Sequence, residues 1–468
     1  MFRSEPSAGL KWVRVWLAFA VAGIGMARAG DWVELRTPYF RVISEASETR
    51  TREWGIEFEL FRRGMELVMP VDPTRVDPVT LVLFNSDRRL RPFKPMENGK
   101  PARMVGYFTR AGAEKFIALG IEGSRDAVRE LLFHEAVHWH LAAADRPRPL
   151  WLEEGLAEVF GNFRLDGDRF VIGAFRPHFM RHVQASTPLP FAKMMELGST
   201  GLNYNGKHAE LTVHFYQQAW LMVHELIFGT EGFGYLPLRW YLLVPPQHPD
   251  PMEDFARGMK IDPAKMDERL AHYLARGRFS TFIYPFDRRT VDAGFVLRRA
   301  PDAEVDLTLG SLLVGAGRLA EAEPYLRRAD TAMPQDSRAL EALGNLAEAL
   351  GRTDDAAGHY AESIRRGGSS FLAHYFLGKY SLRETGALSA GAPDANSAVE
   401  HLVGCIRSNP RFGPAYESLA LALPMLSARC AAAEELLEQG AVRFPTSPKI
   451  QMGASYVSWL KRESGKAK

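Results

Sequence analysis

Three things are scarce in this chain of 468 residues: cysteine, net charge and long apolar runs. The two cysteines, Cys405 and Cys430, are too few for a disulfide scaffold and lack the spacing of a cysteine zinc site. A net charge of +2 is not the large excess of positive charge that is typical of nucleic-acid-binding proteins. No segment reaches the about 18 uninterrupted apolar residues that a membrane-spanning helix needs. The composition therefore predicts an ordinary globular chain that binds no nucleic acid.

The N-terminal segment concentrates apolar residues behind a basic start. Basic side chains at positions 3, 11 and 14 precede the apolar run 15–26, and Ala27, Arg28 and Ala29 place small residues where signal peptidase cuts. We expect a signal peptide over residues 1–29 and no stable membrane span after its removal; an uncleaved anchor is the alternative. The expected destination is the bacterial periplasm or the exterior of the cell.

A His-Glu-x-x-His motif at residues 134–138 carries the most specific chemical signal. His134 and His138 lie about one helical turn apart, so both imidazoles project from one face and can converge on one metal ion. Glu135 lies on the adjacent stripe, from which its carboxylate can take the proton of a metal-bound water. Zinc, the expected metal, needs a third protein ligand and an open fourth position to be catalytic.

A glutamate-rich segment at residues 151–158 offers the third ligand. Prolines at positions 147 and 149 end the first helix and allow a second helix to return across it. Glu154 is the expected ligand. Glu153 competes with it, but the two differ by about 100° of helix rotation, so only one can face the ion. Glu158, one turn further on, is expected to accept the second ring N–H of a ligating histidine.

Together, His134-Glu135-x-x-His138 and the Trp-Leu-x-Glu-Gly-Leu-Ala-Glu run from 151 to 158 resemble the gluzincin metallopeptidases, in particular the peptidase-MA-like group of bacterial secreted proteins. The resemblance extends more weakly from about residue 32 to about residue 228. It implies peptide hydrolysis at a zinc ion, with Glu154 as the zinc-binding glutamate. It also implies an oxyanion-stabilising residue, which would be Tyr216, with His214 and His208 as rivals.

We expect the N-terminal part to be an α+β zincin-like metallopeptidase domain over residues 30–285. The sequence patterns predict strands at 39–43 and 79–84, helices at 45–68, from about 124, and at 210–228, and hairpins at 104–119 and around 166–167. An exposed edge of the small sheet would pair with an extended peptide substrate. A connector over residues 286–301 follows.

The C-terminal third repeats itself. A Leu-Gly pair recurs at residues 309, 343 and 377, a spacing of 34 residues. This period predicts an all-α tetratricopeptide-repeat solenoid over residues 302–460, whose groove would hold a peptide or a partner protein; a non-repetitive helical bundle is the alternative. Cys405 and Cys430 would lie on second helices of adjacent repeats as free, buried thiols.

Two other functions stay open at this point. In one, the chain is a non-enzymatic scaffold of the cell envelope that binds partners through its repeats, and its metal site is structural or vestigial. In the other, the zinc site serves an amidase or deacylase that acts on cell-wall or lipid substrates, because the same metal constellation directs water at many carbonyls.

Overall fold

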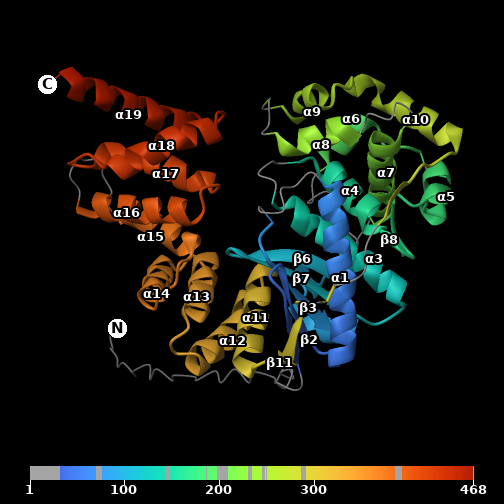
Figure 1. Cartoon of the computed structure of the whole chain (residues 1–468), viewed down its shortest axis with the longest axis horizontal. Helices are drawn as coiled ribbons and strands as arrows, with labels where there is room; N and C mark the ends of the chain where they lie inside the picture. The colour runs from blue at the N-terminus through green and yellow to red at the C-terminus, as the bar shows by residue number, and fades with distance from the viewer. Residues whose placement is uncertain are drawn as a thin grey trace, which may run out of the picture.

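The structure is a computed structural model that describes residues 32–69, 76–143, 148–185, 187–197, 209–229, 235–244, 248, 250–285, 291–292, 294–384 and 393–466. The predicted signal peptide, His208 and part of the predicted connector lie outside these residues. The chain has a mixed sheet with helices in its N-terminal part and an all-helical C-terminal region (Figure 1). This confirms the broad class expected from the sequence.

A six-stranded sheet forms the centre of the N-terminal part, in the order β11-β1-β2-β3-β7-β6. The strands are β1 (Val33–Arg36), β2 (Phe40–Ser44), β3 (Val79–Phe84), β6 (Gly106–Ala111), β7 (Glu114–Gly120) and β11 (Val296–Arg299). β2, β3 and β7 run parallel, and the other pairs are antiparallel. β3 is almost wholly apolar because helices cover both faces of the sheet. β6 is one edge strand, and β11, from the predicted connector segment, is the other.

Two helices, α1 (Glu48–Val68) and α3 (Arg125–Leu141), pack on one face of this sheet. Helix α4 (Leu150–Gly161) packs against α3, and α7 (Ala209–Phe228) packs against α4. The predicted site residues lie on α3, α4 and α7. Ser124 caps α3 by accepting a hydrogen bond from the Ala127 amide at 3.3 Å, which starts the helix where the sequence predicts it. Phe61 of α1 stacks on Phe133 of α3 with ring centroids 4.4 Å apart, fixing the metal-motif helix to its neighbour.

Smaller elements close this part of the chain. The predicted hairpin around residues 166–167 forms, with Gly167 at a φ of 57° in its turn. The elements are α2 (Asp87–Leu90), η2 (Arg91–Phe93), β4 (Met96–Glu97), β5 (Lys100–Pro101), β8 (Arg164–Asp166), β9 (Arg169–Ile172), α5 (Pro177–Ala185), α6 (Phe191–Glu196), α8 (Tyr235–Leu243), α9 (Pro251–Met259), η4 (Pro263–Lys265), α10 (Met266–Arg276) and β10 (Phe282–Pro285).

The C-terminal helices stack pair upon pair in a column that begins beside the sheet (Figure 1). They are α11 (Asp302–Gly315), α12 (Leu319–Ala332), α13 (Ser337–Ala349), α14 (Thr353–Arg365), α15 (Phe371–Glu384), α16 (Pro393–Ser408), α17 (Gly413–Ala422), η5 (Leu423–Met425), α18 (Ala431–Arg443) and α19 (Pro448–Lys466). Among the described residues, no helix combines the length and apolar character needed to cross a bilayer.

The recurring Leu-Gly pairs occupy equivalent places in these helix pairs. A Cβ atom at Gly310 of α11 would lie 2.5 Å from Leu326 of α12, and one at Gly344 of α13 would lie 2.5 Å from Tyr360 of α14. Each glycine therefore lets the second helix of its pair approach closely. This is the physical reason for a glycine every 34 residues.

The second face of the sheet is covered by the first C-terminal helices. One apolar cluster joins Phe84 and Phe116 of the sheet to Leu309 and Leu312 of α11 and Leu343 of α13. The N-terminal sheet and the C-terminal helices consequently share a hydrophobic core, although the sequence suggested separate domains.

The two cysteines are free, as expected, but only one is buried. Cys405 is buried on α16, and burial raises the pKa of its thiol to about 12. Cys430 was predicted to be buried on a helix, and this is wrong: it is half-buried and precedes α18. Helix α17 ends at Ala422, the short 3-10 helix η5 that follows it contains Pro424, and residues 426–430 are not helical.

Candidate metal centre

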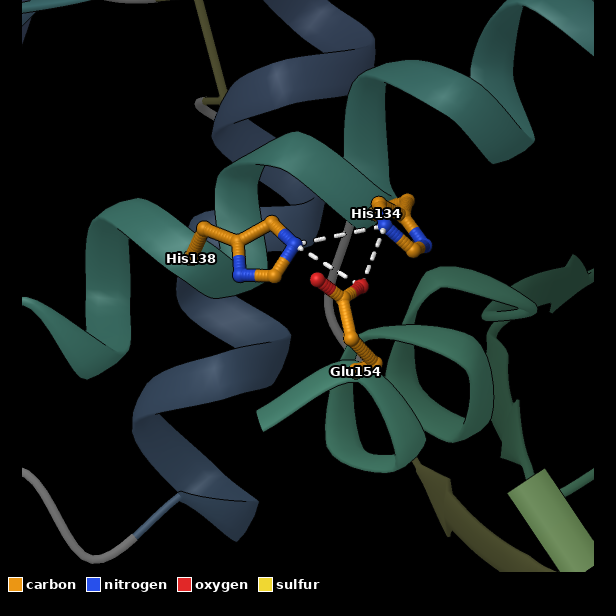
Figure 2. Close-up of side chains that lie close together, drawn as sticks. All are labelled: His134, His138 and Glu154. Carbon is orange, nitrogen blue, oxygen red and sulfur yellow. Dashed lines mark hydrogen bonds and ion pairs between the residues drawn. The ribbon is translucent and has the colours of Figure 1, made fainter. Parts of the chain in front are cut away.

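Three predicted side chains meet between α3 and α4. Figure 2 shows His134 and His138 on α3, with Glu154 of α4 pointing between them. The Nε2 atoms of the two histidines are 3.3 Å apart. Each lies 3.5 Å from Oε2 of Glu154. The three potential ligand atoms therefore form a nearly equilateral triangle.

The triangle fits a metal ion. Ligand atoms bound tetrahedrally at about 2.0–2.1 Å from an ion are about 3.4 Å from one another, close to the three separations found here. Oε2 of Glu154 is buried and accepts no hydrogen bond, so a cation would supply its missing partner. Among the described residues, only His134, His138 and Glu154 form a group able to hold a metal ion.

The charges in this cluster reinforce one another. Burial opposes protonation of His138, but the Glu154 and Glu153 carboxylates outweigh it and hold the pKa of His138 well above its usual value. Burial also opposes ionisation of Glu154, yet the two histidines hold the pKa of its carboxyl far below the usual range. Glu154 is thus a carboxylate at neutral pH, the form that a metal ligand needs.

A second carboxylate faces the other ring nitrogen of each histidine. Oε1 of Glu158 lies 3.5 Å from Nδ1 of His134, the place expected for it from the helical spacing. Oε1 of Glu153 lies 3.5 Å from Nδ1 of His138. Glu153, weighed above as a rival ligand, lies outside the triangle and beside a ligand. Such carboxylates orient the imidazoles and fix which nitrogen faces the ion.

Arg176 extends this arrangement and was not found from the sequence. It forms an ion pair with Glu158, a second one with Glu130 at 3.3 Å, and packs over the Phe179 ring at 4.0 Å. Arg176 precedes α5 and is remote in sequence from both motifs, so no local pattern marks it. It holds Glu158 beside His134.

Glu135, the predicted proton acceptor, is tied to the edge strand of the sheet. The backbone N–H of Phe108 on β6 donates a hydrogen bond to Oε2 of Glu135 at 2.7 Å. This bond fixes the Glu135 carboxylate between the metal-motif helix and the strand. The sequence predicted both elements but not the bond.

A cavity of about 900 Å³ opens in front of these residues. Its wall includes His134, His138, Glu154 and Glu135 on one side, and β6 with the preceding segment 103–105 on another. Tyr216 of α7 also lines it, so the structure brings this predicted residue to the site. His214, its rival, is buried on the same helix and does not line the cavity.

Two further histidines have no place in the site. The two-residue spacing from His138 predicts that His140 faces away from the ligands as a surface or hydrogen-bonded histidine. It does not line the cavity, but it is buried, and neither ring nitrogen has a hydrogen-bond partner among the described residues, so that second part of the prediction is wrong. Burial and the nearby Arg62 lower its pKa to about 4. His224 is a satisfied core histidine, with Nδ1 at 2.7 Å from the Tyr273 hydroxyl and Nε2 at 2.9 Å from the Gly173 carbonyl oxygen.

No protein-family model matches this chain, and no curated protein is similar to it in sequence. His134, His138 and Glu154 surround a common point, with Glu135 next to His134 in the chain.

Proposed function

We propose that this chain is an exported zinc metallopeptidase of the gluzincin type with a zincin-like catalytic part and a C-terminal tetratricopeptide-repeat array. One observation carries the proposal: three metal-ligand atoms form a triangle of the size that zinc takes, on the wall of a cavity that also holds a glutamate beside them.

The donor set supports zinc. Two imidazole nitrogens and one carboxylate oxygen are a ligand set of catalytic zinc sites. When bound by His134, His138 and Glu154, zinc would polarise a scissile carbonyl and make water a stronger acid. A structural zinc site is usually closed by a fourth protein ligand, and the described residues offer none. This favours the enzyme over the scaffold.

Other residues of the chain accept a proton, stabilise negative charge or orient the metal ligands. Glu135 accepts the proton of the attacking water, because the Phe108 N–H holds Oε2 in place and leaves Oε1 for the proton. Tyr216 of α7, which lines the cavity, donates its hydroxyl hydrogen to the oxygen on which negative charge develops. Glu158 and Glu153 keep the two imidazoles oriented.

The position of β6 favours a peptide as substrate. An edge strand has one row of unpaired backbone groups, and an extended peptide can pair with them as an added strand. β6 lies at the end of the sheet and lines the cavity. Its open side would hold the substrate backbone across the metal, with the scissile bond next to Glu135.

The C-terminal helices support the repeat assignment through the 34-residue period and the matching roles of Gly310 and Gly344. We assign the catalytic part to residues 30–285 and the repeats to residues 302–460. The repeat groove recruits protein substrates or a partner protein. The basic and apolar residues of segment 1–29 direct export.

Zinc content measured by elemental analysis on the purified protein tests the proposal. Wild type and Glu135→Gln should each hold about one zinc per chain, since Glu135 is no ligand, whereas Glu154→Ala should hold little. Peptide hydrolysis should be present in wild type and absent in Glu135→Gln. Zinc-free wild type, or equal zinc in all three proteins, would contradict the metal site. Hydrolysis of acylated glycans or lipids but not of peptides would redirect the proposal to an amidase or deacylase.

A further inference from the structure

Strand β6 is hydrogen-bonded to Glu135 of the candidate catalytic site through Phe108 and to helix α11 through the next residue, Thr109. We propose that helices α11 and α13 hold β6 in its catalytic position, with Thr109 and Gly315 as positioning residues. The repeat region is then part of the catalytic unit and not only a module that recruits substrate. This inference rests on the proposed function, in which β6 binds the substrate and orients Glu135.

The catalytic contact of β6 is short and specific. The Phe108 N–H donates to Glu135 at 2.7 Å, and Gly106, Tyr107 and Phe108 line the cavity. A displacement of β6 would therefore move both the proton acceptor and the strand that pairs with a substrate. Misplacement of reacting groups by about 1 Å can cost about a hundredfold in rate.

The neighbouring residue Thr109 makes the structural contact. Its hydroxyl donates a hydrogen bond to the carbonyl oxygen of Gly315, the last residue of α11, at 2.7 Å. The approach is so close that a Cβ atom at Gly315 would lie 2.9 Å from the Arg110 carbonyl oxygen and 2.9 Å from Cγ2 of Thr109. Only a glycine allows α11 to end against β6 in this way.

The tip of the same hairpin meets the next repeat. Gly112, in the turn between β6 and β7, has a φ of 60°, and a Cβ atom there would lie 2.4 Å from Asn345 of α13. Asn345 is itself held by the Tyr360 hydroxyl of α14, which donates to its Oδ1 at 2.9 Å. The hairpin is thus contacted by the first two repeats.

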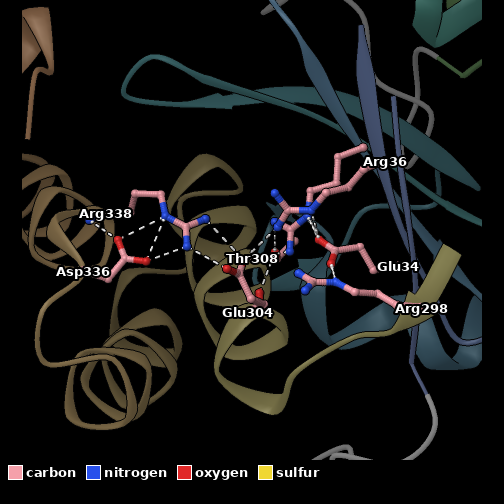
Figure 3. A network of polar contacts seen from close by, with 8 residues as sticks. Glu34, Arg36, Arg298, Glu304, Thr308, Asp336 and Arg338 are labelled. Atoms are coloured by element: carbon pink, nitrogen blue, oxygen red, sulfur yellow. Dashed lines mark hydrogen bonds and ion pairs between the residues drawn. The ribbon is translucent and has the colours of Figure 1, made fainter. Parts of the chain in front are cut away.

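Helix α11 can hold β6 in place because ion pairs fix α11 to strands at the centre of the sheet. Figure 3 shows a chain of ion pairs that runs from Glu34 on β1 to Arg338 on α13. Arg41 of β2 lies 2.6 Å from Glu34 and 2.9 Å from Glu304 of α11, and Glu304 lies 2.6 Å from Arg338. The side chain of Glu34 is fully buried. Movement of α11 along the sheet would break the Arg41–Glu304 ion pair, in which the two side chains are only 18% and 10% exposed.

An edge strand needs such support. Within the described part of the chain, β6 pairs by backbone hydrogen bonds only with β7, and no strand lies on its outer side. The contacts through Thr109, Gly112 and Gly315 therefore add a constraint from outside the sheet, at the residues that follow Phe108. Their loss would leave the zinc ligands on α3 and α4 untouched.

Gly315→Ala tests whether the contact between α11 and β6 holds the strand in place, with Gly358→Ala as its matched control. Both glycines are helical, and alanine favours a helix at either place. Only at Gly315 does the new methyl group meet β6, since a Cβ atom at Gly358 has no neighbour within 4 Å. In the zinc-loaded full chain, we expect Gly315→Ala to speed amide hydrogen exchange at residues 106–111 and to lower kcat/KM for a peptide about tenfold, mainly through kcat. Zinc content should not change, and Gly358→Ala should match wild type.

Thr109→Val and Thr109→Ser provide a second, milder pair. Valine removes the hydroxyl donor without changing the shape of the side chain. It should therefore raise amide exchange at residues 106–111 and lower kcat/KM, but less than Gly315→Ala does, whereas serine should give wild-type values of both. Unchanged exchange at 106–111 together with unchanged kcat/KM in both Gly315→Ala and Thr109→Val would overturn the inference. If wild type hydrolyses no peptide, the proposed function fails, and the exchange measurement still decides whether α11 holds β6.

Discussion

Gly155 of α4 lies directly against the backbone of Ala219 on α7: a Cβ atom at Gly155 would be 2.4 Å from the Ala219 carbonyl oxygen. This contact sets the distance between the helix that carries Glu154 and the helix that carries Tyr216. The ligand and the predicted oxyanion-stabilising residue are thus placed relative to each other by a residue that takes no part in the chemistry.

Gly155→Ala should therefore disturb both stability and metal binding. The methyl group must push α4 and α7 apart, which we expect to lower the free energy of unfolding by about 2 kcal/mol. Displacement of Glu154 should weaken zinc binding in the same variant. Urea unfolding followed by circular dichroism, and zinc titration against a competing chelator, measure the two effects. Gly358→Ala, which meets no neighbour, serves again as the control; a Gly155→Ala protein as stable as this control would contradict the close contact.

Glu158→Gln should weaken zinc binding about 10- to 100-fold without removing a ligand, because a glutamine orients and polarises His134 less well than a carboxylate. Glu153→Gln is the matched comparison on the other histidine. Its effect should be smaller, since the Glu153 side chain is 32% exposed and that of Glu158 only 13%. Competition with a fluorescent zinc chelator gives both affinities. An affinity equal to that of wild type in Glu158→Gln would argue against its contact with His134.

His224 should make stability depend on pH between about 4 and 6.5. Burial lowers the pKa of His224 from 6.5 to about 4. A depressed pKa means that the stabilising contribution is complete above 6.5 and is lost as the pH falls toward 4, where the folded protein must accept the proton. The loss is of the order of 3 kcal/mol.

The comparison with His224→Gln isolates this effect. The free energy of unfolding of both metal-free proteins should be measured by chemical unfolding at several pH values. The difference between wild type and the variant should shrink as the pH falls from 7 to 4. The metal-ligand histidines titrate in both proteins and cancel in the difference. A constant difference across this range would show that His224 does not stay neutral.

Glu34→Gln should destabilise the junction between the sheet and the C-terminal helices. Burial opposes the ionisation of Glu34, but Arg41, Arg298 and Arg36 outweigh it and lower the pKa of this carboxyl. Loss of one partner in a buried ion-pair network costs about 3 kcal/mol. The stabilisation is present above the ordinary pKa of 4.5 and disappears as the pH falls through the lowered value.

The difference in the free energy of unfolding between wild type and Glu34→Gln should therefore be largest at pH 7 and should shrink progressively as the pH falls below 4.5. Glu323→Gln removes an exposed helical pair with Arg327, in which the arginine side chain is 61% exposed, and should change stability by less than about 0.5 kcal/mol. If both substitutions changed the free energy of unfolding equally at pH 7, the burial of Glu34 would not make its ion pairs more stabilising than an exposed pair.

The features that depend on local geometry can be predicted from the amino-acid sequence. One helical turn separates His134 from His138 and Glu154 from Glu158, so their shared faces follow from the 3.6-residue period. The strands at 79–84 and 106–120 and the helices at 48–68 and 125–141 follow from apolar periodicity and from caps such as Ser124. The equivalence of Gly310 and Gly344 follows from their spacing.

Which of these local features come into contact depends on how the helices and the sheet pack. The rotation of α4 against α3 made Glu154 the third member of the triangle and placed Glu153 beside His138. Arg176, the Phe108 N–H, and the packing of α11 on the sheet are contacts between segments far apart in the chain. Such contacts have no signature in the neighbouring sequence, because they depend on how the formed helices and strands pack against one another.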